Sequence, residues 1–145
     1  MTSILFVCHG NICRSAMAEY VMKKLVRDAG LSPRVRIASA ATSTEELGNP
    51  VYPPVRSLLN RHGIDCAGHS ARQLTRRDGE EYDLIIGMDE ANMRNIRRIC
   101  GDDCRAECRM LLDRAVADPW YTRDFEATWR DVNEGCRALL EKLQK

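Results

Sequence analysis

Hydrophobic positions change their spacing within the first 28 residues of the chain. Residues 4–7 are four consecutive apolar side chains with β-branched and aromatic members, which is typical of a buried strand. An octapeptide at 8–15 follows, and beyond it apolar residues recur at helical spacing: Met17, Tyr20, Val21 and Leu25. The pattern therefore predicts a strand, a loop and a helix over 16–28, with Glu19 off the apolar face.

The rest of the chain continues this alternation of strands and helices. Further strands are predicted at 35–38, 84–87 and 109–112, and residues 42–54, rich in Thr, Ser, Gly and Pro, are predicted to be a surface loop. Helices are predicted at four places: 54–61, a short segment begun by Thr75, a segment capped by Asp89, and 125–143. Four strands alternating with helices predict one α/β domain over 1–145. Its four-stranded parallel sheet should be doubly wound, with helices on both faces.

The octapeptide joins the first strand to the first helix and contains reactive side chains. A loop in this position can wrap backbone N–H groups around an anion, and the helix dipole adds positive potential. Gly10 permits a positive φ, and Asn11 is the next most tolerant residue. Cys8 opens the loop and Arg14 closes it, which indicates a cysteine nucleophile that faces a bound phosphate. Because such loops follow the first strand, the site is expected at the carboxyl ends of the strands.

The spacing of Cys8 and Arg14 alone is a weak signal, since Cys66 and Cys108 are also followed by Arg six positions later. Context separates the three pairs. The segment after Cys108 has no glycine, and the segment at Cys66 does not follow an apolar strand. Only the segment at Cys8 has the strand, glycine, arginine and helix in order.

Residues 7–15 closely resemble the phosphate-binding loop of low-molecular-weight protein tyrosine phosphatases. The resemblance extends along the chain through segments 39–43, 48–50, 61–64, 71–74, 88–92 and 118–121. It implies the doubly wound fold, phosphotyrosine-containing protein substrates and a metal-free reaction without a cofactor through a cysteinyl-phosphate.

The catalytic roles follow from chemistry and from this resemblance together. Cys8 is the expected nucleophile, because a helix N-terminus and a guanidinium favour thiolate. Arg14 would clamp two phosphate oxygens with its planar fork. Asp118, before Pro119, is the expected general acid and then base. Ser15 is expected to cap the helix and to donate to the Cys8 sulfur.

The remaining site residues surround these groups. The resemblance assigns the phosphate-binding loop to His9, Gly10, Asn11, Ile12, Cys13 and Ser15. It also implies that Ser39 and His69 hold Asn11 by hydrogen bonds. Cys13 matches a second loop cysteine that can form a reversible disulfide with the nucleophile. The pocket rim is expected at Trp120, Tyr121 and Glu45.

Three residues depart from the family pattern. His9 stands at a usually apolar loop position, and Ala16 replaces a usual proline. Glu45 stands where an aromatic rim residue is common. None of the three departures removes a catalytic group, but they can give this protein a substrate preference different from that of the family.

Composition narrows the possible partners and the compartment. The net charge is +1 with 30% charged residues, so no global field favours nucleic acid or a membrane surface. Seven cysteines without an export signal indicate reduced thiols and a cytoplasmic protein, and a monomer is expected. Cys100, Cys104 and Cys108 do not match zinc-ligand spacing and are interpreted as incidental thiols rather than a metal or redox site.

Other functions share the loop. A thiol-dependent arsenate reductase needs a shuttling cysteine pair soon after the third strand, where this chain has Gly87 and Met88. Protein arginine phosphatases typically carry Thr at the position of Ile12. A non-catalytic phosphate-binding or redox-sensing module would have an inert Cys8.

Overall fold

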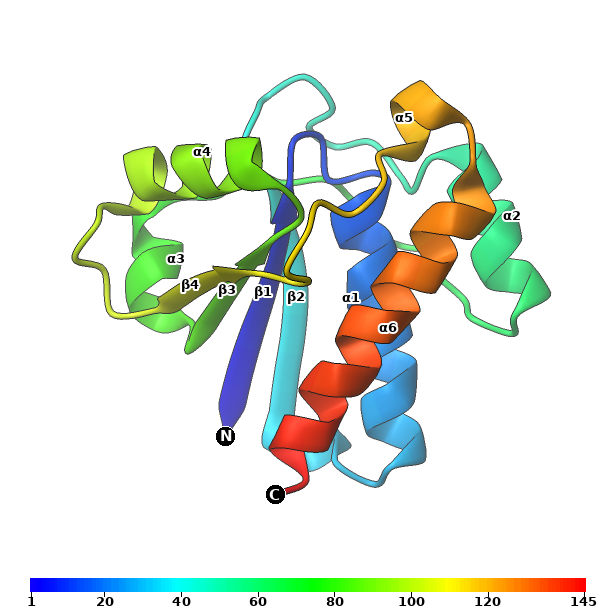
Figure 1. Ribbon diagram of the computed structural model, residues 1–145, viewed down its shortest axis with the longest axis horizontal. Coiled ribbons are helices and arrows are strands. Elements are labelled where there is room, and N and C mark those ends of the chain that lie inside the picture. The colour runs from blue at the N-terminus through cyan, green and yellow to red at the C-terminus, as the bar shows by residue number, and fades with distance from the viewer.

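A computed structural model describes all of residues 1–145 and places four parallel strands in one sheet. The strands are β1 (Thr2–Cys8), β2 (Val35–Ala41), β3 (Leu84–Gly87) and β4 (Glu107–Met110), in the spatial order β2-β1-β3-β4 (Figure 1). In the register, Val7 lies between Ala40 of β2 and Gly87 of β3. The predicted parallel sheet is confirmed, and its most buried strand is the one that leads into the octapeptide.

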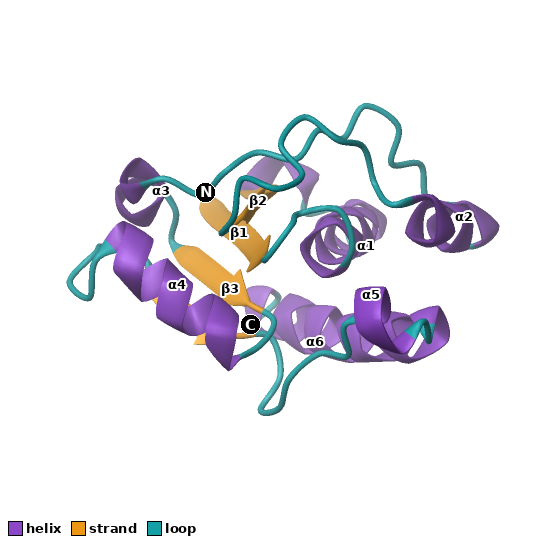
Figure 2. Ribbon diagram, turned by 90° about the horizontal axis from the view of Figure 1, so that it is seen from above, coloured by secondary structure: helices purple, strands orange, loops and turns teal.

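Helices cover both faces of the sheet. The helices are α1 (Arg14–Asp28), α2 (Pro53–Arg61), α3 (Arg76–Glu81), α4 (Glu90–Cys100), α5 (Pro119–Thr122) and α6 (Phe125–Leu143), with a short 3-10 turn at Ser32–Arg34. Figure 2 shows α1 and α6 on one side of the strands and α3 and α4 on the other. None of these helices is both long and apolar enough to span a bilayer. The doubly wound prediction is confirmed.

Alternate residues of β1 supply the two halves of the core. Ile4 and Phe6 belong to the larger apolar cluster beneath α1 and α6, whereas Leu5 and Val7 belong to the smaller cluster beneath α3 and α4. All four side chains are fully buried. Because successive side chains of a strand point to opposite faces, a strand covered on both faces must be apolar throughout. That requirement explains the uninterrupted apolar run near the N-terminus.

The chain reverses its direction across the sheet at β1. It runs from β1 outward to β2, and then returns past β1 to β3 and β4. Such a switch point leaves a crevice at the carboxyl end of the central strand, where ligands bind in open α/β sheets. The octapeptide lies at this point, as predicted.

Several predicted boundaries were wrong by one to three residues. β4 begins and ends two residues before the predicted 109–112 strand, because pairing with β3 fixes its limits. β2 extends three residues beyond the predicted end, along β1. α5 was not predicted, since its four residues are too few to show a periodicity.

Candidate active site

The Cys8 sulfur lies at the end of β1 and receives several donors from its own loop. The backbone N–H groups of Asn11 and Ser15 donate to the sulfur at 3.4 and 3.5 Å, and the Ser15 hydroxyl lies 3.0 Å from it. Cys8 is only 3% exposed. Hydrogen bonds to a sulfur from surrounding N–H and O–H groups favour its charged form. The loop therefore directs three donors at the Cys8 sulfur.

Asn11 supplies the sharp bend of the loop. Its φ is 61°, in the left-handed region, and Gly10 is not among the residues with a positive φ, so Asn11 takes the conformation that either residue could have adopted. A non-glycine residue persists in this conformation only when its surroundings fix it. The side-chain amide of Asn11 donates to the hydroxyl oxygens of Ser15 and Ser39, each at 2.8 Å. The backbone carbonyl oxygen of Asn11 lies 2.7 Å from Nε2 of His69. The structure thus brings Ser39 and His69 onto Asn11.

Ser15 does not cap α1, and that prediction was wrong. The helix begins at Arg14 with Cys13 at the N-cap position and no side-chain cap. The first turn starts inside the loop, which leaves the Ser15 N–H directed at the Cys8 sulfur instead of at a capping oxygen. Because Asn11 already donates to the Ser15 oxygen, the Ser15 hydroxyl hydrogen is free to point at the sulfur.

Glu19 belongs to the support of the loop, which the sequence pattern missed. Its side chain was expected off the buried face, but the residue is 7% exposed. The Ser39 hydroxyl donates to one oxygen of the Glu19 carboxylate, and Lys23 donates to the other at 2.5 Å. Nδ1 of His69 lies 3.8 Å from the same carboxylate. The i, i+4 spacing of Ser15, Glu19 and Lys23 is the one signal that could have indicated this polar stack.

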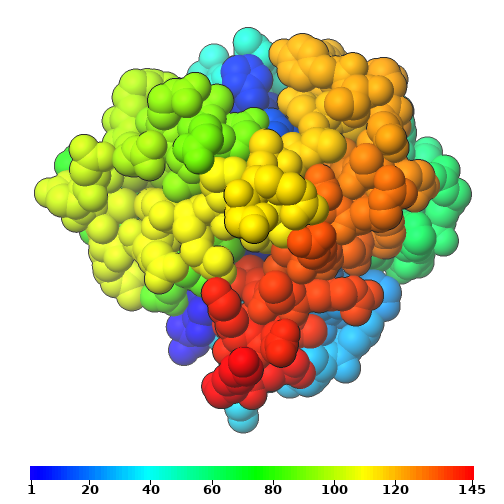
Figure 3. Space-filling view, in the orientation of Figure 1, coloured from blue at the N-terminus to red at the C-terminus, as the bar shows by residue number.

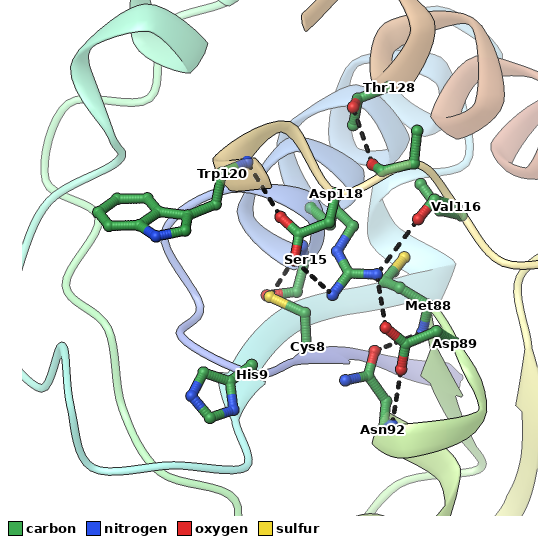
Figure 4. Close-up of polar contacts among 12 residues, drawn as sticks. Cys8, His9, Ser15, Met88, Asp89, Asn92, Val116, Asp118, Trp120 and Thr128 are labelled. Atoms are coloured by element: carbon green, nitrogen blue, oxygen red, sulfur yellow. Dashed lines mark hydrogen bonds and ion pairs between the residues drawn. The ribbon is translucent and has the colours of Figure 1, made fainter. Parts of the chain in front are cut away.

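Arg14 reaches the cavity from the start of α1 and is 4% exposed. Its Nη1 donates to Asp89 at 2.9 Å and to the carbonyl of Val116 at 3.2 Å, and its Nη2 donates to Asp118 at 3.3 Å (Figure 4). Burial works to lower the pKa of Arg14, but the Cys8 sulfur and the two carboxylates raise it overall. The Arg14 guanidinium is therefore charged, and its Nη1 is held in place by two acceptors.

Asp89 was predicted only as a helix cap, and it has two contacts. One oxygen accepts from the backbone N–H of Asn92 at 2.8 Å, which caps α4 as predicted, and the other accepts from Arg14. Burial alone would raise the pKa of Asp89, but the Asn92 N–H and Arg14 hold it below the usual value. Asp89 is thus a second acidic group of the site.

Asp118 is oriented by the short helix α5. One of its oxygens accepts from the Trp120 backbone N–H at 3.0 Å, and the other faces Arg14. Pro119 occupies the first helical position, where its missing N–H is not needed. This geometry turns an acidic side chain toward the cavity and presents the exposed rings of Trp120 and Tyr121 at its edge.

These groups surround one cavity of about 330 Å³ at the carboxyl end of β1. In Figure 3 the start of the chain, in blue, reaches the surface between α4, in green, and α5, in orange. The lining contains Cys8, His9, Gly10, Ile12, Cys13, Arg14, Glu45, Glu46, Asp89, Asn92, Asn95, Asp118, Trp120 and Tyr121. Every predicted site residue lies in this lining except Asn11, Ser15, Ser39 and His69, which lie behind the loop.

Four acidic side chains and one histidine lie around the cavity beside the aromatic rings of its rim. Glu45, Glu46, Asp89 and Asp118 line it, and Nε2 of His9 lies 2.9 Å from the Glu45 carboxylate. His9 and Glu45 are both exposed, with 57% and 69% of their side chains accessible, so their contact at the entrance is weak. The site therefore combines a cationic floor with an anionic edge.

The fold and this cavity define a thiol-based phosphate-handling protein of the doubly wound α/β class. The sequence model of the family described as "Low molecular weight phosphotyrosine protein phosphatase" matches residues 3–145. The chain belongs to this family.

Relatives and solved structures agree over nearly the whole chain. The low molecular weight phosphotyrosine protein phosphatase of Pongo abelii is 43% identical over 97% of this chain and 94% of its own. Low molecular weight protein-tyrosine-phosphatase YfkJ of Bacillus subtilis is 37% identical over 100% of this chain and 97% of its own. The YfkJ crystal structure superposes with a TM-score of 0.95 at 36% identity, covering 99% of this chain and 95% of that one. The low molecular weight protein tyrosine phosphatase of Streptococcus pyogenes gives a TM-score of 0.90 at 39% identity, over 99% and 93% of the chains.

Proposed function

We propose that this chain hydrolyses phosphotyrosine in proteins, with Cys8 as nucleophile, Arg14 as phosphate clamp and Asp118 as general acid and base. The observation that supports this most directly is the convergence of the three side chains on one cavity. The three residues line the cavity together, with Arg14 anchored at Nη1 and Asp118 in contact with its Nη2. Family membership supplies the substrate class.

In the first step the Cys8 thiolate attacks phosphorus and the bond from phosphorus to the tyrosyl oxygen breaks. Loop N–H groups and the guanidinium of Arg14 stabilise the charge that spreads over the equatorial oxygens. Asp118 gives its proton to the leaving tyrosyl oxygen. The products are a cysteinyl-phosphate and free tyrosine hydroxyl, so charge and atoms balance.

Substrate binding and acid catalysis are coupled through Arg14. Asp118 contacts Nη2, the nitrogen that a phosphate oxygen would use, while Asp89 and Val116 hold Nη1. A phosphate dianion at the loop takes Nη2 and repels the Asp118 carboxylate, which favours the protonated acid. The Arg14 guanidinium keeps its position because its Nη1 stays bound to Asp89 and to the Val116 carbonyl. Binding thus prepares Asp118 to donate.

In the second step water attacks the cysteinyl-phosphate, and Asp118 now accepts the water proton. The sulfur leaves as thiolate, and the Ser15 hydroxyl with the loop N–H groups stabilises that charge. Asn11, Ser39 and Glu19 keep Ser15 oriented through a continuous line of hydrogen bonds. The same donors therefore serve both the attack and the departure of the sulfur.

Cys13 is proposed to protect the nucleophile against over-oxidation. Burial, together with the nearby Cys8 charge, raises the pKa of Cys13 to about 12, so Cys13 stays a thiol near neutral pH. Peroxide attacks a thiolate to give a sulfenic acid, and a neighbouring thiol can displace water from it to form a disulfide. The pair would make inactivation reversible.

The structure favours the phosphatase over an arsenate reductase. A reductase would need a second cysteine pair within reach of Cys8, but Cys100, Cys104 and Cys108 are absent from the cavity lining. Asp118, the proposed acid for hydrolysis of a phosphate monoester, lines the cavity. We further propose that 1–145 acts as one catalytic domain in the cytoplasm, where its seven thiols stay reduced.

The test is a comparison of phosphorylated peptides of one sequence that carry phosphotyrosine, phosphoserine or phosphoarginine. We expect release of phosphate from phosphotyrosine, unaffected by a chelator, and trapping of a phosphorylated Cys8 by rapid acid quench. Cys8→Ser should still bind phosphate but lose turnover by more than 1000-fold. Preferred release from phosphoarginine, or turnover by Cys8→Ser within tenfold of wild type, would overturn the proposal.

A further inference from the structure

Three cysteines that the mechanism does not use gather at the other side of the sheet. Cys100 ends α4, Cys104 lies in the loop that follows, and Cys108 lies in β4. A Cβ added to Gly79 of α3 would lie 2.9 Å from the Cβ atoms of both Cys100 and Cys104. The Sγ atoms of Cys104 and Cys108 are 3.8 Å apart. The sequence was interpreted as giving incidental thiols here, but the fold makes two of them neighbours.

We propose that Cys104 and Cys108 are a second redox-active pair of this protein, closing to a reversible disulfide that is independent of the catalytic cysteines. Both are half-buried and therefore within reach of a small oxidant. Cys100 is 2% exposed and its thiol is directed at the Thr75 carbonyl, 3.6 Å away. No group of three or more His, Cys, Asp or Glu side chains is placed to hold a metal ion, which favours a disulfide over a metal site.

The local backbone holds the two sulfurs toward each other. Each sulfur lies 3.7 Å from the carbonyl of Ala106, so the segment between them curls back on itself. Arg105 fixes the middle of that segment, since its guanidinium donates to Asp83 at 2.7 Å and to the Tyr82 carbonyl at 3.3 Å. A bond between the sulfurs needs them to approach from 3.8 Å to about 2.05 Å.

Hydrogen peroxide is the oxidant in the proposed reaction. Burial raises the pKa of the Cys108 thiol to about 12, with the Cys104 sulfur adding to the shift, so Cys108 is assigned the resolving role. Cys104 attacks peroxide, becomes a sulfenic acid and releases one water. The Cys108 sulfur then forms the S–S bond, the S–O bond of Cys104 breaks, and the Cys108 proton leaves with the hydroxyl as a second water. Two thiols and one peroxide thus give a disulfide and two waters.

The catalytic cysteines cannot exchange directly with this pair. Cys108 pairs with Ile85 of β3, which pairs with Leu5 of β1, so its backbone is two strands and three residues away from Cys8, roughly 14 Å. Cys104 and Cys108 pack against the apolar cluster beneath α3 and α4, whereas Cys8 and Cys13 belong to the cluster on the other face. The sheet therefore separates the two dithiols. The inference does not depend on the proposed catalytic function.

Trypsin makes the pair directly observable. Cleavage after Arg98, Arg105 and Arg109 places Cys104 in peptide 99–105 and Cys108 in peptide 106–109. The full chain is treated with hydrogen peroxide in excess inorganic phosphate, which shields the catalytic loop. Free thiols are then alkylated, and the unreduced digest is analysed by mass spectrometry. We expect the two peptides joined by a disulfide that dithiothreitol reverses.

Matched variants identify the sulfurs. Cys100→Ser should keep the linked peptide, because Cys100 shares peptide 99–105 but is not the partner. Cys108→Ser and Cys104→Ser should each reduce it by more than tenfold, with circular dichroism checking the fold of both. A link lost in Cys100→Ser, a disulfide confined to peptide 99–105, or sulfinic acid at Cys104 without any link would overturn the proposal.

Discussion

The guanidinium of Arg14 and the carboxylate of Asp118 face each other across the cavity, with Nη2 3.3 Å from Oδ2. The two residues are separated by 104 positions in the chain: Arg14 begins α1, and Asp118 caps the start of α5. In the proposed mechanism, phosphate binding and proton donation therefore belong to one pair of side chains. Removing Asp118 should affect the two in opposite directions.

Asp118→Ala is expected to lower kcat for a phosphotyrosine peptide by about 10²–10⁴-fold, the usual size of a lost general acid. The loss should be smaller for nitrophenyl phosphate, whose better leaving group needs less protonation. Competitive inhibition by inorganic phosphate should be as strong as in the wild type or stronger, because Nη2 of Arg14 is freed from a carboxylate. Equal losses of kcat on both substrates, or weaker phosphate inhibition, would contradict this account.

Asp89→Asn separates the capping role of Asp89 from its contact with Arg14. Asparagine caps helices about as well as aspartate, so α4 should keep its start. The charged partner of Nη1 is lost, and we expect kcat/KM to fall by about tenfold or more, while the unfolding temperature falls only by the contribution of the Asp89 charge. The matched control is Asp124→Asn at the N-cap of α6, whose side chain accepts from Ala127 and does not contact Arg14. A comparable loss of activity in that control would argue for a general effect of caps.

The same variant gives a pH test. The folded state holds the pKa of Asp89 below its ordinary value of 3.8. A carboxyl whose folded pKa is depressed stabilises the fold fully above the unfolded pKa and loses that contribution as pH falls through the folded pKa. The difference in unfolding free energy between wild type and Asp89→Asn should therefore be constant near neutral pH and shrink below about pH 4. A difference that grew toward acid pH would reverse the assigned sign.

Local patterns predicted the parts of this protein that lie close together in sequence. The strand, the loop and α1 are contiguous, and each follows from hydrophobic spacing and from Cys8, Gly10 and Arg14 within one short segment. The limits of β4 were misplaced because they depend on pairing with β3, which leaves no trace in the spacing of its own residues.

The site residues that were missed depend on tertiary contacts. Asp89 meets Arg14 across 75 positions, and Glu19 meets Ser39 across 20. Sequence spacing cannot show that two such side chains converge. Asp118 was identified only because it precedes Pro119 in a segment that resembles the family, since an isolated Asp-Pro turn has no distinctive signal. The Cys104–Cys108 contact spans only four positions, but it depends on how the chain turns between α4 and β4, which the spacing of the cysteines does not specify.

Packing of α6 against the end of β4 leaves no room for a side chain at Gly135. A Cβ there would lie 2.3 Å from Cγ of Leu111, a residue 8% exposed. Gly135→Ala should therefore lower the free energy of unfolding by about 1–3 kcal/mol, although alanine favours helix. Denaturant unfolding measures it, and the double variant with Leu111→Ala should lose less than the sum of the two single changes. Additive losses would show that the two residues do not compete for space.

The acidic rim should set which sequences around phosphotyrosine are preferred. Glu45 and Glu46 stand at the entrance, and only Glu45 has a basic partner, His9, whose contact is exposed. Peptides with Lys or Arg beside phosphotyrosine should show a lower KM than peptides with Glu there. The preference should weaken as salt rises, because exposed charges are screened beyond about 10 Å at 0.1 M.

Glu46→Lys should reverse the order of the two peptides while kcat for nitrophenyl phosphate stays within twofold. Glu141→Lys, a charge change on α6 outside the cavity lining, is the control. If the ratio of the KM values of the two peptides is the same in Glu46→Lys as in Glu141→Lys, the rim does not select the substrate.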